Sequence, residues 1–261
     1  DITVRDLLTH HSGMRPDVDL VPRWSGEQTG IDLALKDKPV TTPGRRFIYS
    51  DINFILLAEI VRAVSGQRVD QYTQEHVFQP LGMKDTGFLP PAGKRNRIAP
   101  TEITDGAPLL GIVHDPTTRY MGGVAGHAGL FTTASDLARF AEMILNGGSY
   151  HGQRILQPGT VAKMTAPASP GASPDLRGLG WDVDSRFSSN RGELFPLGSF
   201  GHTGFTGTSL WIDPASKTYV ILLTNSVHPQ RRSVVSLRAK VATVAAQMAG
   251  VTGQGVTLTS Y

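Results

Sequence analysis

The sequence contains no cysteine, and this absence narrows the chemistry that the chain can carry. Disulfide bonds, thiolate nucleophiles and cysteine-ligated zinc are all excluded. Charged residues make up only 18% of the chain, and its formal charge of +3 is the difference between 25 basic and 22 acidic residues. So small an excess of positive charge gives no indication of a nucleic-acid partner. The chain also lacks an apolar run of the length that would predict a membrane span.

Two further classes of motif are missing. The sequence has no Gly-x-x-x-x-Gly-Lys loop for phosphate groups and no His-Glu-x-x-His motif for a metal ion. His114 and His127 are therefore interpreted as loop histidines bonded to the backbone, with the glycine cluster beside His127 forming a possible wall of a cleft. We predict neither a cofactor nor a metal ion.

Helix signals dominate the first part of the chain. Thr3 and Asp6 form a capping-box pattern at the start of a short helix, and His10 and His11 are expected to contact its last carbonyl groups. The first residue is Asp1, directly before this helix start, which we interpret as a chain that begins inside a longer protein.

Several other helices follow from spacing and capping residues. Ser50 is expected to cap a helix over about 51–64 that Ser65-Gly66 ends. The Pro- and Gly-rich stretch before it, up to about residue 46, is expected to be a loop, as is most of 84–131. The remaining helices are expected over 69–78, from a second capping box at 133–136 to residue 145, and near 158–164.

The pattern changes from helical to extended after about residue 178. β-Branched and aromatic residues predict strands over 200–205, 208–212 and 219–224, and an amphipathic helix over 232–248. This order predicts an α+β fold. We expect a single domain over 1–261, with a helical and loop-rich part over about 1–177 and a sheet covered by the terminal helix over about 178–261. Three strands make a thin sheet for this length, so further strands are expected outside the sequence.

Tyr49-Ser50-Asp51 is the first cluster that could carry chemistry. It places a phenol directly before a helix N-terminus, where the helix dipole and free amides favour the phenolate, so Tyr49 could act as a base. An aromatic ring that packs the helix entry is the alternative interpretation.

His202-Thr203-Gly204 is the second cluster, inside the glycine-rich stretch 201–207. It puts a ring that can become a cation and a hydroxyl on one short strand, and the glycines would let a ligand approach the backbone. A bulged edge strand with a polar histidine is the alternative.

Together and in this order, the two clusters resemble the second and third motifs of the serine β-lactamase and penicillin-binding-protein superfamily, in its class C-like, D,D-carboxypeptidase and esterase branch. Similar stretches run along the chain: 2–13, 43–66, 178–181 and 201–214. The resemblance implies the β-lactamase/transpeptidase-like α+β fold. It also implies an acyl-enzyme reaction on a lactam, a D-amino-acid peptide or an ester, and an extracytoplasmic location.

The resemblance also implies roles for individual residues. Tyr49 would transfer protons and His202 would supply positive or hydrogen-bonding character near the substrate carboxylate, which makes both catalytic candidates. The implied substrate-binding residues are Asp51, Thr203, Gly204 and Phe205. Thr203 would hold the carboxylate, and the Phe205 amide would be one of two oxyanion donors.

Three departures from the family pattern stand out. No serine has a lysine three residues later, so the nucleophile is expected upstream of this sequence, and the chain alone is expected to be inactive. Asp51 stands where many members carry asparagine. His202 stands in place of the usual lysine, which would make carboxylate binding depend on pH near neutrality.

Two other functions remain open on sequence alone. The chain could be a non-catalytic relative that binds a peptide or a cell-wall fragment, or an unrelated soluble binding domain. The family fold would place missing strands beside 219–224. That edge is therefore expected to be open, with possible self-association through it.

Overall fold

The computed structural model describes residues 1–171 and 173–253, in which the chain folds as two compact units. The first unit comprises Asp1–Asp136 with Ser169–Ser173, and the second comprises Leu137–Ala168 with the chain from Pro174 onward. The expectation of a single domain divided near residue 177 stays a prediction. Within the described ranges, no helix combines the length and the apolar character that crossing a bilayer requires.

The first unit opens with α1 (Val4–Leu8), and the predicted capping box is confirmed. The Thr3 hydroxyl accepts from the Asp6 amide at 3.2 Å, while the Asp6 carboxylate accepts from the Thr3 amide at 2.8 Å. Two donors at the helix start are thereby satisfied reciprocally.

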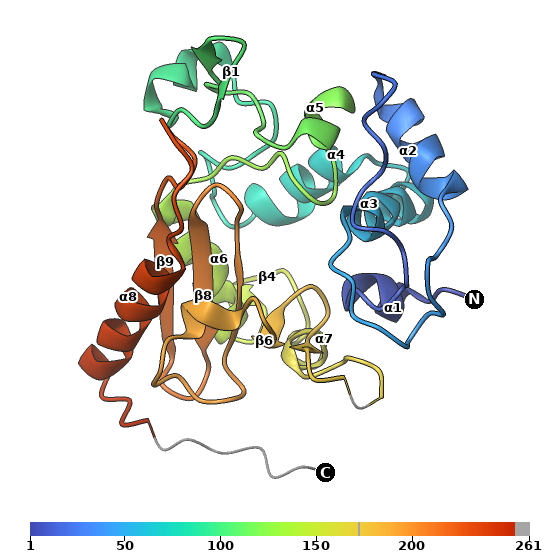
Figure 1. Ribbon diagram of the computed structural model, residues 1–261. Coiled ribbons are helices and arrows are strands. Elements are labelled where there is room, and N and C mark those ends of the chain that lie inside the picture. The colour runs from blue at the N-terminus through green and yellow to red at the C-terminus, as the bar shows by residue number, and fades with distance from the viewer. Residues whose placement is uncertain (172, 254–261) are drawn as a thin grey trace. The chain divides into compact units, whose positions relative to one another are not determined.

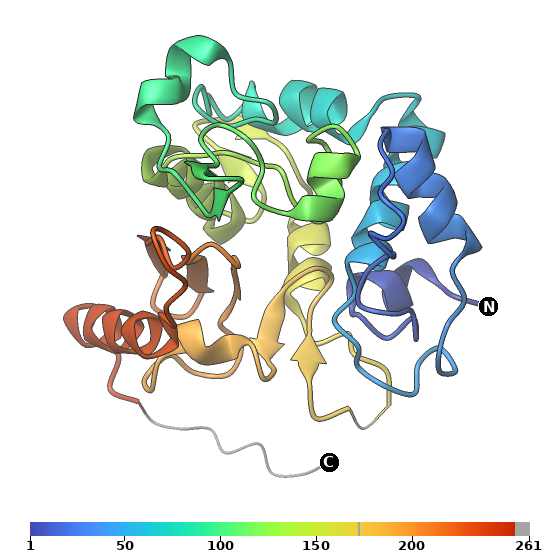
Figure 2. The same ribbon diagram turned by 45° about the horizontal axis from the view of Figure 1, so that its top comes forward.

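The core of this unit forms where α1 and α2 (Glu27–Lys36) pack against α3 (Asp51–Ser65) (Figure 2). The expectation of a loop up to residue 46 is therefore wrong over α2. Its Gly30 lies where a Cβ would collide with the Met121 side chain, so close packing requires this poor helix former. The buried members of the cluster are Met14, Val18, Ile31, Ala34, Ile52, Ile55, Met121 and Ala125.

The C-terminal end of α3 agrees with the prediction, and the N-terminal end differs from it. Gly66 ends the helix in the left-handed conformation, as predicted, with φ 76°. Ser50 occupies the N-cap position but makes no side-chain cap bond. Its hydroxyl instead donates to the Arg15 carbonyl at 2.5 Å and ties the helix start to the preceding loop.

The remainder of the first unit consists of short elements. They are α4 (Val69–Thr73), the π-helical η1 (Gln74–Phe78), the 3-10 helix η2 (Ala92–Arg97), the hairpin of β1 (Ile103–Thr104) with β2 (Ala107–Pro108), and α5 (Pro116–Tyr120). η2 and α5 lie in the stretch expected to be mostly loop.

α6 (Ala134–Leu145) starts at the second predicted capping box, of which only half forms. The Thr133 hydroxyl accepts from the Asp136 amide at 3.2 Å. The Asp136 carboxylate, which is buried beside Thr86, instead accepts from the Asp85 amide and the Thr86 hydroxyl.

The second unit contains a five-stranded antiparallel sheet in the order β5-β6-β7-β8-β9, two strands more than predicted (Figure 1). The strands are β5 (Leu176–Arg177), β6 (Asp182–Asp184), β7 (Phe200–Thr203), β8 (Thr208–Asp213) and β9 (Thr218–Leu223). The other elements are the hairpin of β3 (Ser149–Tyr150) with β4 (Gln153–Arg154), α7 (Pro158–Thr165), the 3-10 helix η3 (Ser188–Arg191) and α8 (Val235–Met248).

One face of this sheet packs on α8. Trp211 and its cross-strand partner Val220 point to that face, where Trp211 joins Ala242 and Ala246 in a buried cluster. Burying an indole removes on the order of 200 Å² from water, worth roughly 5 kcal/mol. The indole N–H donates to the Ser199 hydroxyl at 2.9 Å, so its polar group is also satisfied.

The other face of the sheet packs on α6. Successive strand residues point to opposite sides of a sheet, so the neighbours of Trp211 and Val220 along their strands point to this face. Phe200 lies against Trp181 with ring centroids 5.2 Å apart, and Trp181 stacks on Phe140 of α6. The Tyr219 hydroxyl donates to Glu142 of α6 at 3.2 Å. An antiparallel sheet between helices confirms the α+β fold class.

Candidate active site

Tyr49 and Asp51 lie at the start of α3 in the first unit. The Asp51 amide donates to the Pro16 carbonyl at 2.7 Å, and the Tyr49 side chain is 37% exposed. Solvent therefore reaches the phenol while the backbone that carries it is anchored, which suits a group that transfers protons.

A buried histidine supports Tyr49. The ring of His10, only 1% exposed, stacks on the Tyr49 ring with centroids 4.2 Å apart and an interplanar angle of 29°. His10 Nδ1 accepts from the Ser50 amide at 3.1 Å. Because this nitrogen accepts, it carries no proton, and the ring is uncharged.

A short hydrogen-bond chain reaches the same nitrogen of the His10 ring. The Ser12 hydroxyl donates to the Asn53 carbonyl oxygen at 2.5 Å, so the Asn53 amide nitrogen faces His10 Nδ1 at 3.3 Å. The expected contacts with the last carbonyls of α1 are confirmed for both histidines, since His11 Nδ1 contacts the Thr9 carbonyl at 2.8 Å and the His10 amide donates to the Leu7 carbonyl at 3.2 Å. His10 lies in the turn after α1 with φ 58°, and in this conformation its ring stacks on Tyr49.

Asp51 faces three other titratable groups of the first unit. Its carboxylate, that of Asp115 and a ring nitrogen of His127 all lie within 4.8 Å of one another, and the charge of Asp17 also acts on it. Burial raises the pKa of Asp51 to about 6; the two other carboxylates add to this rise, and His127 opposes it. Asp51 thus titrates near physiological pH, mainly because it is buried and to a smaller extent because of its charged neighbours.

His127 does not bond to the backbone as expected. Its Nε2 lies 2.9 Å from the Asp115 carboxylate and 2.9 Å from the Thr118 hydroxyl. Asp115 is itself fixed as the N-cap of α5, where it accepts from the Thr118 amide at 2.6 Å. The interpretation failed because the partner lies twelve residues away and becomes a neighbour only when α5 forms.

Asp51, Asp115 and His127 are also residue types that bind metal ions. Nε2 of His127 already engages Asp115 and Thr118, which accounts for its position without an ion. We therefore treat the three residues as an ion-pair cluster.

His202 lies on β7 in the second unit, on the same face as Phe200. Its Nδ1 donates to the Thr203 carbonyl at 2.8 Å, since a carbonyl can only accept. Burial lowers the pKa of His202; Asp182 acts in the opposite direction, and Arg177 lowers the pKa further. The expected pH dependence of this group therefore moves to the acid side of its ordinary range.

Arg177 and Asp182 form a fully buried ion pair between β5 and β6, with 0% and 1% of their side chains exposed. The Ser185 hydroxyl also donates to the Asp182 carboxylate at 2.8 Å. Neither residue was expected in the site, because a charged pair on two very short strands gives no sequence signal.

The turn after β7 is fixed by a residue of α8. Arg238 donates through Nη2 to the carbonyls of Gly204 at 2.7 Å and Thr208 at 2.8 Å. The Phe205 side chain is 60% exposed, and the Arg231 guanidinium lies 4.5 Å above its ring. The backbone that carries the expected oxyanion donor is therefore tied down, while the side chain beside it faces solvent.

The glycines of this stretch have a packing reason as well. A Cβ at Gly201 would collide with the Leu210 carbonyl and the Trp211 ring, and one at Gly204 would collide with the Thr208 hydroxyl. The approach of the neighbouring strand thus explains both positions before any ligand is considered.

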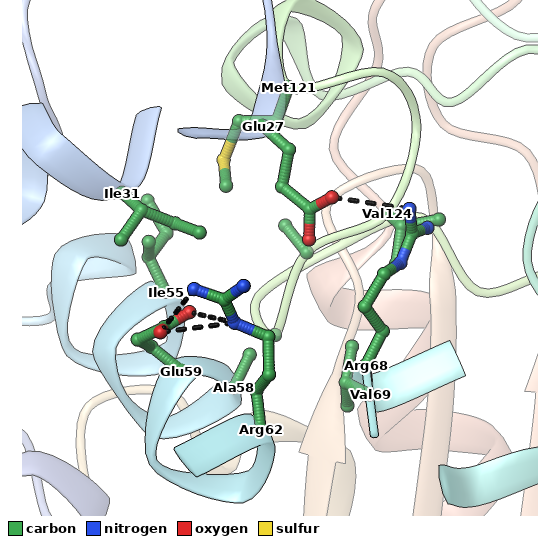
Figure 3. Close-up of a pocket in the computed structure, with 12 residues that line it drawn as sticks. Glu27, Ile31, Ile55, Ala58, Glu59, Arg62, Arg68, Val69, Met121 and Val124 are labelled. Carbon is green, nitrogen blue, oxygen red and sulfur yellow. Dashed lines mark hydrogen bonds and ion pairs between the residues drawn. The ribbon is translucent and has the colours of Figure 1, made fainter. Parts of the chain in front are cut away.

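A pocket in the first unit lies away from these residues. It is formed by the middle of α3 together with α2, α4 and the loop after α5, with Ile31, Ile55 and Met121 among its apolar lining (Figure 3). The arginines on its rim are paired: Arg62 with Glu59 at 2.6 Å and Arg68 with Glu27 at 3.2 Å. Tyr49 and Asp51 do not line it, so we do not assign it as the active site.

The predicted site residues thus fall into two groups. Tyr49 and Asp51 come together at the start of α3 in the first unit, and His202, Thr203, Gly204 and Phe205 lie along β7 and its turn in the second.

The chain belongs to the β-lactamase family, since the family model described as Beta-lactamase matches residues 1–245. This confirms the resemblance that the two motifs indicated. A protein of Escherichia coli K12 named as a D-alanyl-D-alanine carboxypeptidase is 34% identical over 256 residues, with 87% of this chain and 57% of that protein covered. The chain thus spans little more than half the length of this relative.

Solved structures share the fold. A penicillin-binding-protein homologue from Pyrococcus abyssi matches with a TM-score of 0.68 at 23% identity, covering 95% of this chain and 56% of that one. A β-lactamase from Mycobacterium bovis matches with a TM-score of 0.65 at 24% identity, covering 95% and 74%.

Proposed function

We propose that the chain is part of a serine hydrolase of the β-lactamase/D,D-peptidase type, which acts through an acyl-enzyme on an amide, a lactam or an ester. The observation that carries the proposal is the setting of Tyr49. Its phenol reaches solvent at the N-terminus of α3 while its ring is stacked on the uncharged His10. A ring held in this way keeps one orientation, from which its hydroxyl can relay a proton.

In the proposed reaction, a serine oxygen forms a bond to the substrate carbonyl carbon and gives up its proton. Tyr49 takes part in this transfer and then returns a proton to the leaving amine or alcohol as its bond to the carbonyl breaks. The Phe205 amide stabilises the oxyanion, and His202 and Thr203 hold the substrate carboxylate, with Gly204 and Asp51 beside the bound chain. Water then hydrolyses the ester.

These 261 residues contain no Ser-x-x-Lys motif, so in this proposal the serine comes from outside them. We therefore propose that the chain alone does not form an acyl-enzyme. The names of the relatives favour a peptide that ends in a D-amino acid, and family resemblance favours an extracytoplasmic location. The missing motif also leaves a second function: a non-catalytic relative that binds such a peptide.

Intact-mass spectrometry tests this proposal. The chain is incubated with a β-lactam and with a fluorophosphonate, and the expected result is an unmodified mass of 28.0 kDa. The gene is then expressed with its upstream sequence. A Ser-x-x-Lys motif there, with a β-lactam or fluorophosphonate adduct on its serine that Tyr49→Phe slows, supports the hydrolase. A stoichiometric adduct on a serine of the 261 residues contradicts it, and upstream sequence without the motif favours the binding protein.

A further inference from the structure

Four titratable residues of the first unit converge at the start of α3. Asp17 lies in the loop after α1, Asp51 is the first residue of α3, Asp115 is the N-cap of α5, and His127 lies in the glycine-rich loop before α6. The His127 side chain is only 3% exposed. Four segments that are distant in sequence therefore bring three carboxylates and one imidazole together.

Hydrogen bonds account for three of these groups but not for the fourth. Asp17 accepts from the Thr117 hydroxyl at 2.6 Å and the Val18 amide at 2.8 Å. Asp115 and His127 are bonded to each other. In the described part of the chain, the Asp51 carboxylate accepts no hydrogen bond, although it is largely buried. An ionised carboxylate in such a place needs a counter-charge.

His127 is the group that supplies the counter-charge. Burial acts to lower the pKa of His127, but the hydrogen bond with Asp115 and the charges of Asp115, Asp51 and Asp17 outweigh it and hold this pKa above its ordinary value. Burial likewise acts to raise the pKa of Asp115, and the bond and charge of His127 hold it below its ordinary value. The cation is therefore stabilised where Asp51 faces it.

We propose that His127, oriented by Asp115, is a positioning residue that pairs electrostatically with Asp51 and so allows the second motif to carry aspartate where many members of the family carry asparagine. The link to catalysis rests on the proposed function, but the pairing itself does not. Asparagine offers both a donor and an acceptor, whereas an ionised aspartate only accepts. At neutral pH the motif then presents an acceptor to a substrate N–H, and at lower pH the protonated carboxyl regains a donor.

The pairing can be measured on the 261-residue chain without any activity. Carboxyl carbon NMR follows the titration of Asp51, which is identified by its loss in Asp51→Asn and is expected near pH 6. His127→Asn removes the cation, so the Asp51 midpoint should rise by about one unit or more. His76→Asn is the matched control: His76 belongs to the same unit, its side chain is 47% exposed, and its removal should leave the midpoint unchanged.

A reciprocal measurement covers the case in which His127→Asn does not fold. Asp51→Asn is isosteric, and because linkage is mutual it should lower the midpoint of the His127 ring by a similar amount. A shift below about 0.3 unit in either titration overturns the proposal, since an opposite charge at this range shifts a pKa by about 1 to 3 units. A stoichiometric divalent ion that chelation removes, and that suppresses both titrations, would also overturn it in favour of a metal site. Failure of the hydrolase proposal changes neither titration.

Discussion

Replacing Arg177 by methionine leaves the carboxylate of Asp182 buried without its counter-charge. Both side chains are almost fully removed from water, and within residues 1–171 and 173–253 the Ser185 hydroxyl is the other donor to this carboxylate. Removing one partner of a buried pair costs about 3–5 kcal/mol, because the remaining charge has neither water nor a counter-ion. We expect Arg177→Met to destabilise the second unit by about this amount.

Urea denaturation followed by tryptophan fluorescence is a suitable assay, because Trp181 and Trp211 are buried in the same unit. The double variant Arg177→Met/Asp182→Asn removes both charges and should recover most of the loss. Arg191→Met is the matched control: its ion pair with Asp184 leaves 24% and 35% of the two side chains exposed, so water still reaches the remaining carboxylate and the loss should stay below about 1 kcal/mol.

The same variants act on His202 in opposite directions. Arg177 lowers the pKa of His202 and Asp182 raises it, so Arg177→Met should raise the titration midpoint of the His202 ring and Asp182→Asn should lower it.

Two results of the urea experiment would refute the reasoning about the buried pair. One is a loss of less than about 1 kcal/mol in the free energy of unfolding for Arg177→Met, and the other is a double variant that loses as much as the two single variants together.

Three other outcomes can be checked by stability and association measurements. Because the pKa of Asp51 is higher in the folded chain than in the unfolded chain, its contribution to the free energy of unfolding is fully present below the unfolded pKa and is lost as the pH rises through about 6. Between about pH 4.5 and 7.5, urea melts should show that the free energy of unfolding of wild type falls by about 2 kcal/mol more than that of Asp51→Asn. His10→Phe keeps a ring under Tyr49 but leaves the Ser50 amide without its acceptor, so urea melts should show a loss of about 1–3 kcal/mol. Among the described strands β9 pairs only with β8, so sedimentation should show association that rises with concentration, whereas a monomer at all concentrations would contradict an open edge.

Local patterns predicted local structure well. The capping box at Thr3 and the glycine end of α3 depend on residues within one helical turn, and both are confirmed. The strands β7, β8 and β9 were expected within about two residues of their ends, because β-branched and aromatic residues mark them.

What the sequence did not reveal depends on contacts between distant segments. The helix signal of α2 was weak because the helix contains Gly30, and glycine is a poor helix former. The close approach of Met121, some ninety residues later, leaves no room for a Cβ at this position. β5 and β6 have two and three residues and are centred on a buried ion pair rather than on apolar side chains. Hydrophobic periodicity cannot predict strands that are this short and carry charged residues.

The candidate site divides in the same way. Tyr49 and His202 could be named because each stands in a short motif, whereas His10 and His127 could not be assigned their roles. His10 meets Ser50 across 40 residues of sequence, and His127 meets Asp115 only through the turn of α5. The sequence signal was a place at a helix end for His10 and a place beside a glycine cluster for His127, and neither says which group the ring will face.

The two departures from the family motifs follow one physical rule. Each places a group that titrates nearer to neutral pH, and in each case the charges of a neighbouring ion pair act on its pKa in addition to burial: the pair of Asp115 with His127 for Asp51, and the pair of Arg177 with Asp182 for His202. Burial raises the first pKa and lowers the second, so at neutral pH Asp51 is largely ionised and His202 is neutral. Both groups then gain a proton as the pH falls, and each unit becomes more positive. The binding of an anionic ligand to either unit should therefore strengthen in acid, which a lysine and an asparagine at these two positions would not produce.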